Sequence, residues 1–342
     1  MISNPLTALR VLLLLTGSLL ACSVPTSFAQ TGAQPAAATS STASVFPSKP
    51  IRIIVGFTAG GPTDRVAREV AAKLQEAWGQ PVSIDNKPGA GSRIAFEALS
   101  RSEPDGHTLL VSGIQTATNQ VLYKKLGYDV LRDFAPVTQL TSTVLVLVVN
   151  PALPPRDLST LVAWAKSRAQ PLSYATSGVA SAPHFAGALF EQSANVATTH
   201  IPFSGAAQAQ TAVVGGQVES AFVSPMSAMT LIQDGKLRAL AVTGDRRFAV
   251  IPNVPTMAEA GMPAFEVSSW QGMIAPGGTP APVLQKLHQE IARILALPDV
   301  RARLQAVAAE PVGSSPAEFR RYIESEIRKW QRVANRANIS VD

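Results

Sequence analysis

Glycine and hydroxyl residues, rather than the usual catalytic side chains, mark the places in this sequence that could bind a ligand. In the run from Phe57 to Asp64, Gly60 and Gly61 stand directly before Pro62, which suits the first position of a helix. The unpaired N–H groups and positive dipole at a helix start attract carboxylates and phosphates. The pattern predicts an anion-binding turn; the alternative is an ordinary turn between strand and helix. A P-loop is not predicted, because Pro62 occupies the position of the phosphate-binding lysine.

A second stretch of this kind runs from Thr176 to Phe185 and contains Ser177, Ser181 and His184. His184 could act as a base beside Ser181, but it follows Pro183 in the first turn of a predicted helix, where a structural role is the better interpretation. The sequence also lacks the Gly-x-Ser-x-Gly motif of common serine hydrolases. We therefore interpret the two serines as hydrogen-bond donors to a ligand and not as nucleophiles.

The sequence predicts neither a metal site nor a cofactor. The four histidines are far apart and lack the spacing of metal ligands. The run from Gly89 to Gly91 begins like a dinucleotide-binding fingerprint, but Ile94 stands where the third glycine belongs. We expect no cofactor and no metal, and we expect that the protein is not an enzyme.

Chain length and net charge limit the number of domains and the class of partner that we expect. The chain has 342 residues, enough for two domains with sizeable cores. Its net charge of +6 is modest, its Lys and Arg residues are scattered, and aromatic residues make up only 6% of the chain. These features do not indicate a nucleic-acid partner.

Residues 1–29 have the pattern of a secretory signal. Arg10 is their only charged residue, and the apolar run from Val11 to Leu20 is too short to span a bilayer comfortably. Cleavage after Ala29 would release a soluble periplasmic protein.

The alternative is a lipoprotein signal over residues 1–21, because Leu19 to Cys22 resembles a lipoprotein box. Cys22 would then be a lipidated N-terminus that tethers the protein to a membrane. It is the only cysteine, so no internal disulfide is expected. Residues 30–45 are uncharged and predict a flexible linker.

An α/β pattern positions the glycine-rich turns. The predicted elements of the first half are a strand over 51–55, a helix from Pro62 to Gly79, a strand over 81–85, a loop over 86–92, a helix to 101, a strand over 107–111, a loop over 127–133, and strands over 135–140 and 144–149. Three of these strands end in loops of small or hydroxyl residues, as in open sheets with a ligand crevice at the strand ends.

After prolines at 151, 154 and 155 the pattern restarts. The predicted elements are helices over 158–168, from 183, from 205 to 214 and from 225 to 235, with strands over 172–175, 200–203, 219–223 and 237–243. An extended crossing segment over 265–274 precedes a helix over 281–296. A capping box from Ser315 to Glu318 begins the last helix.

The order of motifs resembles that of the Bug-type (TctC-type) periplasmic solute-binding proteins of tripartite tricarboxylate transporters. The resemblance extends from about Phe46 to the C-terminus. It is carried by the runs FPSKPIRIIVGFTAGGPTD, NKPGAGS, PDGHTLL, LYKKLGYDVLRDFAPV, SGVASAPH, DGKLRALAVTGDRR, IPNVPTMAEAG and EPVGSSPAEF, in this order.

The resemblance implies an α/β, two-domain, periplasmic-binding-protein-like (type II) fold. Each domain would be a mostly parallel sheet flanked by helices, with the ligand cleft between the domains. Domain 1 would comprise residues 46–148 with 270–342, and domain 2 residues 149–269.

The implied function is capture of a small organic carboxylate by closure of the two domains, followed by delivery to the membrane subunits of a tripartite transporter. The alternative is a periplasmic ligand sensor that docks on the receptor of a two-component system. Either protein is expected to work as a monomer.

The resemblance places the ligand against loops from both domains. The implied ligand-binding residues are Phe57, Thr58, Ala59, Gly60, Gly61, Thr63 and Asp64 in the first loop, Gly89, Ala90, Gly91 and Ser92 in the second, Ser112 and Gly113 in the third, and Thr176, Ser177, Ser181 and His184 from domain 2. In the family, backbone groups of the first loop hold one carboxylate, often through water.

This chain departs from the family pattern at several positions. Gly56 stands where proline is usual, and Arg93 could either add charge to the site or project outward. Phe203 to Gly205 replaces a Tyr-Lys-Gly run. Val223 stands where aspartate, which suits ligands with an amino group, is often found, so we expect plain mono- or dicarboxylates.

Overall fold

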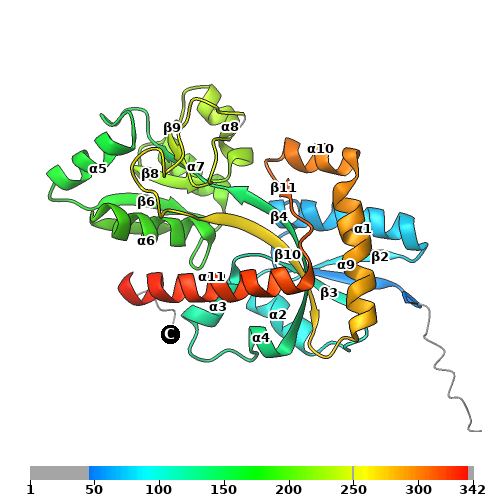
Figure 1. The fold of residues 1–342 in the computed structure, drawn as a ribbon. Coiled ribbons are helices and arrows are strands. Elements are labelled where there is room, and N and C mark those ends of the chain that lie inside the picture. Colours follow the sequence, from blue (N-terminus) through cyan, green and yellow to red (C-terminus); the bar gives the residue numbers. More distant parts are fainter. Residues whose placement is uncertain (1–45, 249, 338–342) are drawn as a thin grey trace, which may run out of the picture. The chain divides into compact units, whose positions relative to one another are not determined.

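The structure, a computed structural model, describes residues 46–248 and 250–337 (Figure 1). The predicted signal, the linker and Cys22 lie outside these residues. The described residues form an α/β fold with two sheets, each covered by helices on both faces, which confirms the predicted fold class. No helix in this part of the chain combines the length and apolar character needed to cross a bilayer.

The first sheet has six strands in the order β11-β4-β10-β3-β1-β2. Their bounds are β1 Ile51–Val55, β2 Val82–Asn86, β3 Thr108–Ser112, β4 Phe134–Val144, β10 Ser268–Pro276 and β11 Glu310–Pro311. β1 pairs in parallel with β2 and β3, whereas β10 is antiparallel to β3 and β4, and β11 is antiparallel to β4.

The second sheet has five strands in the order β7-β6-β8-β5-β9. Their bounds are β5 Val146–Val149, β6 Leu172–Thr176, β7 Thr198–Pro202, β8 Ser220–Val223 and β9 Arg238–Val242. β6 pairs in parallel with β7 and β8, and β5 is antiparallel to β8 and β9. Both sheets are thus mixed, and the expectation of mostly parallel sheets holds only for the β2-β1-β3 and β7-β6-β8 groups.

Two long segments connect the sheets. β4 continues to Val144 and only Leu145 separates it from β5, so the predicted break after Leu140 is wrong. β10 returns the chain to the first sheet and pairs with β4 over its whole length, with two register shifts. The predicted domain ranges remain predictions; their first boundary falls inside β5.

Twelve helical segments surround the sheets in the described residues. They are α1 Pro62–Trp78, the 3-10 turn η1 Ala90–Ser92, α2 Arg93–Ser100, α3 Gln115–Leu122, α4 Val130–Asp133, α5 Leu158–Ser167, α6 Ala182–Ala194, α7 Ala206–Val214, α8 Pro225–Gln233, α9 Ala281–Ala296, α10 Pro298–Ala306 and α11 Pro316–Ala337. α4 corrects the loop predicted over 127–133: the Asp129 carboxylate accepts hydrogen bonds from the N–H groups of Leu131 and Arg132 and so caps this short helix.

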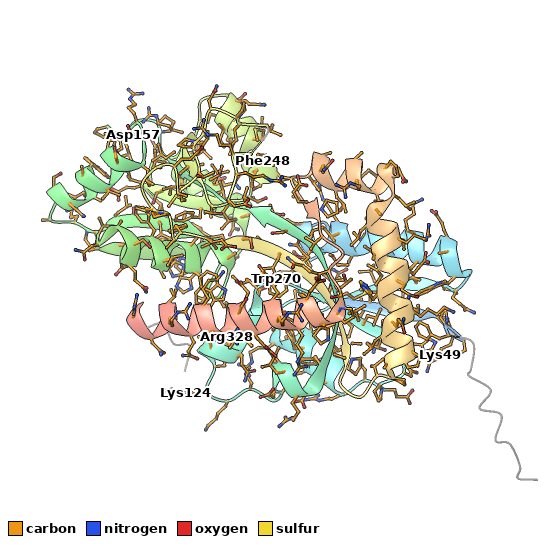
Figure 2. The ribbon with its side chains drawn as sticks, in the orientation of Figure 1. Lys49, Lys124, Asp157, Phe248, Trp270 and Arg328 are labelled. Carbon is orange, nitrogen blue, oxygen red and sulfur yellow. The ribbon has the colours of Figure 1, made fainter. Side chains whose placement is uncertain are left out.

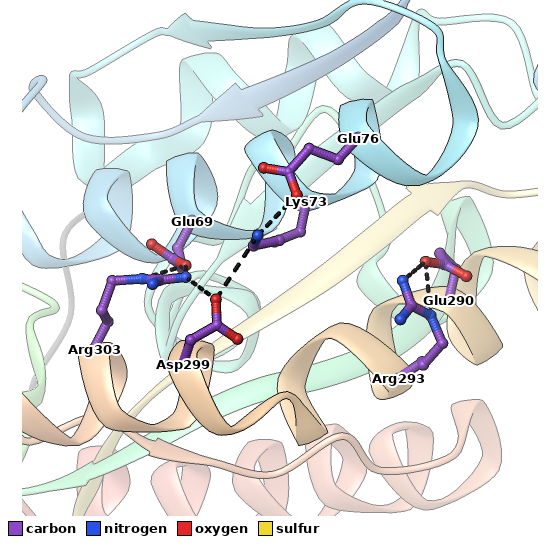
Figure 3. A network of polar contacts seen from close by, with 7 residues as sticks. All are labelled: Glu69, Lys73, Glu76, Glu290, Arg293, Asp299 and Arg303. Carbon is purple, nitrogen blue, oxygen red and sulfur yellow. Dashed lines mark hydrogen bonds and ion pairs between the residues drawn. The ribbon is translucent and has the colours of Figure 1, made fainter.

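α1 shows how the sequence specifies these elements. Pro62 begins it, Gly79 ends it in a left-handed conformation, and Val66, Val70 and Leu74 form its buried face. This face packs on the alternate strand residues of β1 that point toward it, within a core that also includes α9 and α10. On the outer surface Arg303 of α10 pairs with Glu69 of α1 and with Asp299, which also contacts Lys73 (Figure 3).

α11 packs on α3, α6 and β4. It begins at the predicted capping box, where Ser315 and Glu318 exchange hydrogen bonds. Its Glu326 is only 2% exposed, and one carboxylate oxygen accepts from the indole N–H of Trp270 on β10 (3.2 Å) and of Trp330 (2.9 Å). Figure 2 labels Trp270 among the side chains of the molecule. Glu326 therefore links α11, the last helix, to β10, one of the two strands that connect the sheets.

Candidate functional site

The first loop lies between β1 and α1 and is held by one carboxylate. Asp64 is 1% exposed; its Oδ2 accepts from the Gly60 N–H (2.9 Å) and from Arg68 Nε (2.8 Å), and its Oδ1 accepts from Asn86 Nδ2 (2.9 Å). Burial alone would raise the pKa of Asp64, but the hydrogen bonds from Arg68, Gly60 and Asn86 outweigh it and lower the pKa below its ordinary value. Asp64 is thus ionised at neutral pH and supports the loop from inside.

The rim of this loop is open to solvent. Thr58, Ala59 and Gly60 are exposed, whereas Phe57 and Gly61 are half-buried. Gly60 has φ +81°, a conformation that favours glycine. Because the first N–H groups of α1 have no intrahelical acceptor and lie at the positive end of its dipole, the rim can hold an anion without a cationic side chain. Thr63 is buried below the rim.

The second loop supports the first. Residues 89–92 all have positive φ, and the Ser92 hydroxyl, which is buried, donates to the Gly56 carbonyl (3.0 Å). A Cβ atom on Gly56 would lie 2.6 Å from both Cβ and Oγ of Ser92. The buried Ser92 side chain therefore requires glycine at position 56.

α3 joins three of the predicted loops, although sequence reasoning missed it. Ser112 Oγ donates to Thr116 Oγ1 (2.8 Å), which donates to the Gly113 carbonyl (2.8 Å). Asn119 Nδ2 donates to the Gly91 carbonyl (2.9 Å). Thr118 Oγ1 donates to the carbonyl of residue 180, in the loop that follows β6 (3.3 Å). The available signal was the polar run QTATNQ over residues 115–120, one residue after Ser112 and Gly113.

Arg93 is engaged by its neighbours. Its guanidinium carbon lies 4.5 Å from the ring centroid of Tyr123, and its Nη2 lies 4.0 Å from Glu97 Oε1. Among the described residues, its Nε and the Oδ1 of Asn119 are buried polar atoms without a protein hydrogen-bond partner. Arg93 therefore lies beside the second loop with its charge turned toward Tyr123 and Glu97.

The loop from the second sheet, residues 176–181, closes on itself. Thr176 is buried and its hydroxyl lies 2.7 Å from His200 Nε2. Ser181 Oγ donates to the Gly178 carbonyl (2.6 Å). In this structure the Ser181 proton is used within the loop, and donation by Ser181 to a ligand stays a prediction. Ser177 is half-buried and Val179 is exposed.

His184 has a structural role here. Its Nδ1 accepts from the N–H of Ala180 (3.3 Å), so the neutral ring carries its proton on Nε2, and it stacks on His200 with centroids 3.9 Å apart. Burial, with His200 as a smaller cause, lowers the pKa of His184 to about 3, and burial lowers that of His200 to about 4. Both rings are neutral near pH 7, as the interpretation of His184 as structural requires.

A small cavity of about 50 Å³ lies where α1 and α8 begin beside β4 and β10. Its polar lining includes Arg65, Thr143, Ser224, Ser269 and Gln271. The volume suits a few water molecules. The described residues include no group of His, Cys, Asp or Glu side chains arranged to hold a metal ion.

The solved structures that resemble this chain include periplasmic binding proteins. The periplasmic binding protein BugD is 31% identical with a TM-score of 0.76, covering 86% of this chain and 99% of BugD. A Rhodopseudomonas palustris protein, Rpa4515, with adipate gives 34%, a TM-score of 0.78, and 86% and 99% coverage; MatC from the same organism, with bound malate, gives 35%, 0.75, and 84% and 99%. The chain thus has the fold of the periplasmic solute-binding proteins.

The family model described as "Tripartite tricarboxylate transporter family receptor" matches residues 66–339. The chain belongs to this family. The resemblance to Bug-type (TctC-type) proteins inferred from the sequence motifs is therefore confirmed.

Proposed function

We propose that this protein is an exported, non-enzymatic solute-binding protein that captures a small organic carboxylate and delivers it to the membrane subunits of a tripartite transporter. The first loop carries the proposal. It is a glycine-rich rim at the start of α1, fixed from inside by Asp64. The N–H groups at a helix start can neutralise a carboxylate without a lysine. The relatives with adipate and malate bound support the ligand class.

The proposed mechanism is capture between two moving domains, residues 46–148 with 270–342 and residues 149–269. One carboxylate would be held by the rim from Phe57 to Gly61, with Gly91 and Gly113 beside it, and the rest of the ligand would meet the loop from Thr176 to Ser181. Because both sets of loops contact the ligand only in the closed state, binding shifts the open-to-closed equilibrium. The protein is proposed to do this as a monomer in the periplasm.

Ligand capture is tested by a thermal-shift screen of the exported protein. The panel contains adipate, malate, succinate and benzoate, with phosphate, glucose and adenosine as controls. A ligand at about one hundred times its dissociation constant adds about 2.7 kcal/mol of stability. For a chain of this size, each kcal/mol raises Tm by about 1.6 °C, so we expect a rise of about 4 °C. Stabilisation by a control class but by no carboxylate would overturn the ligand assignment.

Two further measurements test the rest of the proposal. The ligand recovered from the complex should be chemically unaltered by mass spectrometry, because a product would indicate an enzyme. Uptake of the labelled carboxylate should fall in cells that lack this protein and return when it is restored. Unchanged uptake with a lost transcriptional response to the carboxylate would instead favour the sensor alternative.

A further inference from the structure

Ala180 is a buried alanine in a left-handed conformation, held through both of its backbone groups. Its φ is +63° and it is 0% exposed. Its N–H donates to His184 Nδ1 (3.3 Å), and its carbonyl accepts from Thr118 Oγ1 (3.3 Å). A residue with a Cβ atom pays a steric cost in this region that glycine does not pay. The two hydrogen bonds offset that cost.

The two partners come from different parts of the fold. His184 lies in the first turn of α6, directly after the loop to which Ala180 belongs. Thr118 lies on α3, which follows β3 of the first sheet. The contact is buried: Thr118 is 0% exposed, and Ala117 of α3 belongs to the same apolar cluster as Ala180 and Phe185. The loop of the second sheet is therefore shaped in part by a side chain attached to the first.

We propose that Thr118 is a positioning residue for ligand binding, because its hydroxyl keeps Ala180 left-handed and thereby sets the backbone of the loop from Thr176 to Ser181. This inference rests on the proposed function, in which that loop meets the ligand. Without the hydroxyl, the Ala180 carbonyl is buried without a partner, and the free energy that favours the left-handed conformation is reduced. Rotation at Ala180 redirects the peptide groups on either side of it.

Because of the position of Ala180, a change in its backbone conformation affects the residues on both sides of it. Ser181, the next residue, is the N-cap of α6, and its hydroxyl closes the loop on Gly178, which itself has φ +126°. A change at residue 180 therefore alters both the start of α6 and the turn that precedes it. Separation of the two sheets at this point would break the bond from Thr118, so loop shape and domain closure are linked.

Thr118→Val tests the proposal, because valine keeps the shape of threonine and removes the hydroxyl. In the protein without ligand, we expect faster hydrogen–deuterium exchange of the backbone amides from Val179 to His184. With adipate and malate as probes, we expect the dissociation constant of whichever binds to rise about tenfold. Thr118→Ser keeps the hydroxyl and should behave like the wild type in both measurements.

A second substitution separates positioning from simple loss of stability. In an Ala180→Gly background the left-handed conformation no longer needs support, so adding Thr118→Val should change the dissociation constant little. The matched control is Ala308→Gly, the same substitution at another left-handed alanine (φ +57°), beyond the end of α10. Ala308→Gly should not rescue Thr118→Val.

Exchange that is unchanged in Thr118→Val would overturn the proposal, as would an equal loss of affinity in the wild-type and Ala180→Gly backgrounds. Rescue by Ala308→Gly would also overturn it. If the wild type binds neither adipate nor malate, the affinity is measured with whichever carboxylate of the thermal-shift panel stabilises the protein; if no carboxylate binds, the carboxylate assignment fails, and the exchange measurement still decides the role of Thr118. If Thr118→Val does not fold, Thr118→Val with Ala180→Gly should fold, and its failure to do so refutes the rescue.

Discussion

Replacing Asp64 by alanine should destabilise the protein by about 3 kcal/mol, more than its position beside a surface loop suggests. The change removes the acceptor of the Gly60 N–H, of Asn86 Nδ2 and of Arg68 Nε at once. A hydrogen bond to a charged group is worth about 1.5–3 kcal/mol, and the sum is discounted because Gly60 and Asn86 are partly open to water. At about 1.6 °C for each kcal/mol, Tm should fall by about 5 °C.

The pH dependence separates the carboxylate from other effects of Asp64→Ala. The folded-state pKa of Asp64 is lowered, so its contribution is present above the pKa of the unfolded chain, near 4, and is lost as the pH falls through the folded-state value. The stability difference between wild type and Asp64→Ala should therefore be constant from about pH 6 to 8 and shrink below about pH 4.

Urea denaturation followed by circular dichroism measures both quantities. Arg68→Ala is the matched control, because it removes one exposed partner of Asp64 and leaves the bonds to Gly60 and Asn86; its effect should be clearly smaller. Carboxylate affinity should fall with Asp64→Ala, since the rim loses its support. A variant with the denaturation midpoint of the wild type, or a difference that persists at low pH, would refute this account of Asp64.

Three other outcomes are expected. Gly56→Ala should lower stability by about 1–3 kcal/mol through the clash with Ser92, and Ser92→Gly should restore much of it; equal Tm values for Gly56→Ala and wild type would contradict this packing. Ser181→Ala should weaken carboxylate binding in calorimetry, because the ligand loop loses the bond that closes it on Gly178, while Ser193→Ala, in the same helix as His184, should not. Because burial lowers the pKa of His184 to about 3, the unfolded chain binds a proton at this residue near pH 6.5 that the folded protein does not bind, and stability falls as the pH drops. His184→Gln should therefore lose less stability than wild type between about pH 7 and pH 5, measured by urea denaturation.

Local sequence patterns were enough to predict the elements that carry strong boundary residues. α1 has Pro62 and Gly79 at its ends and a regular apolar face, and α11 has its capping box. α3 has none of these features: Thr116, Thr118 and Asn119 are poor helix formers, and no side chain caps its start. Its stability comes from packing on α11 and from the apolar cluster that it shares with residues of α6 such as Phe185. A local sequence pattern does not contain these contacts.

Strand direction and the internal supports of the site depend on contacts between distant residues. The antiparallel pairing of β10 with β3 and β4 brings together segments more than a hundred residues apart, so the sequence predicted the crossing segment but not the mixed sheets. The loops themselves were predictable from Gly60, Gly61 and Pro62. Their supports were not: Ser92 reaches Gly56, Asn86 reaches Asp64, and Thr118 reaches Ala180 only after folding.

The Glu326 carboxylate shared by Trp270 and Trp330 should make the intrinsic tryptophan fluorescence sensitive to movement of β10 relative to α11. Trp270 lies on β10, one of the two segments that connect the sheets, while Trp330 lies on α11, and both indole N–H groups point at one oxygen of Glu326. A charge beside an indole in a buried, weakly polarisable environment alters the energy of its excited state. Twisting of β10 against α11 should therefore shift the emission wavelength of the intrinsic fluorescence, without any attached dye.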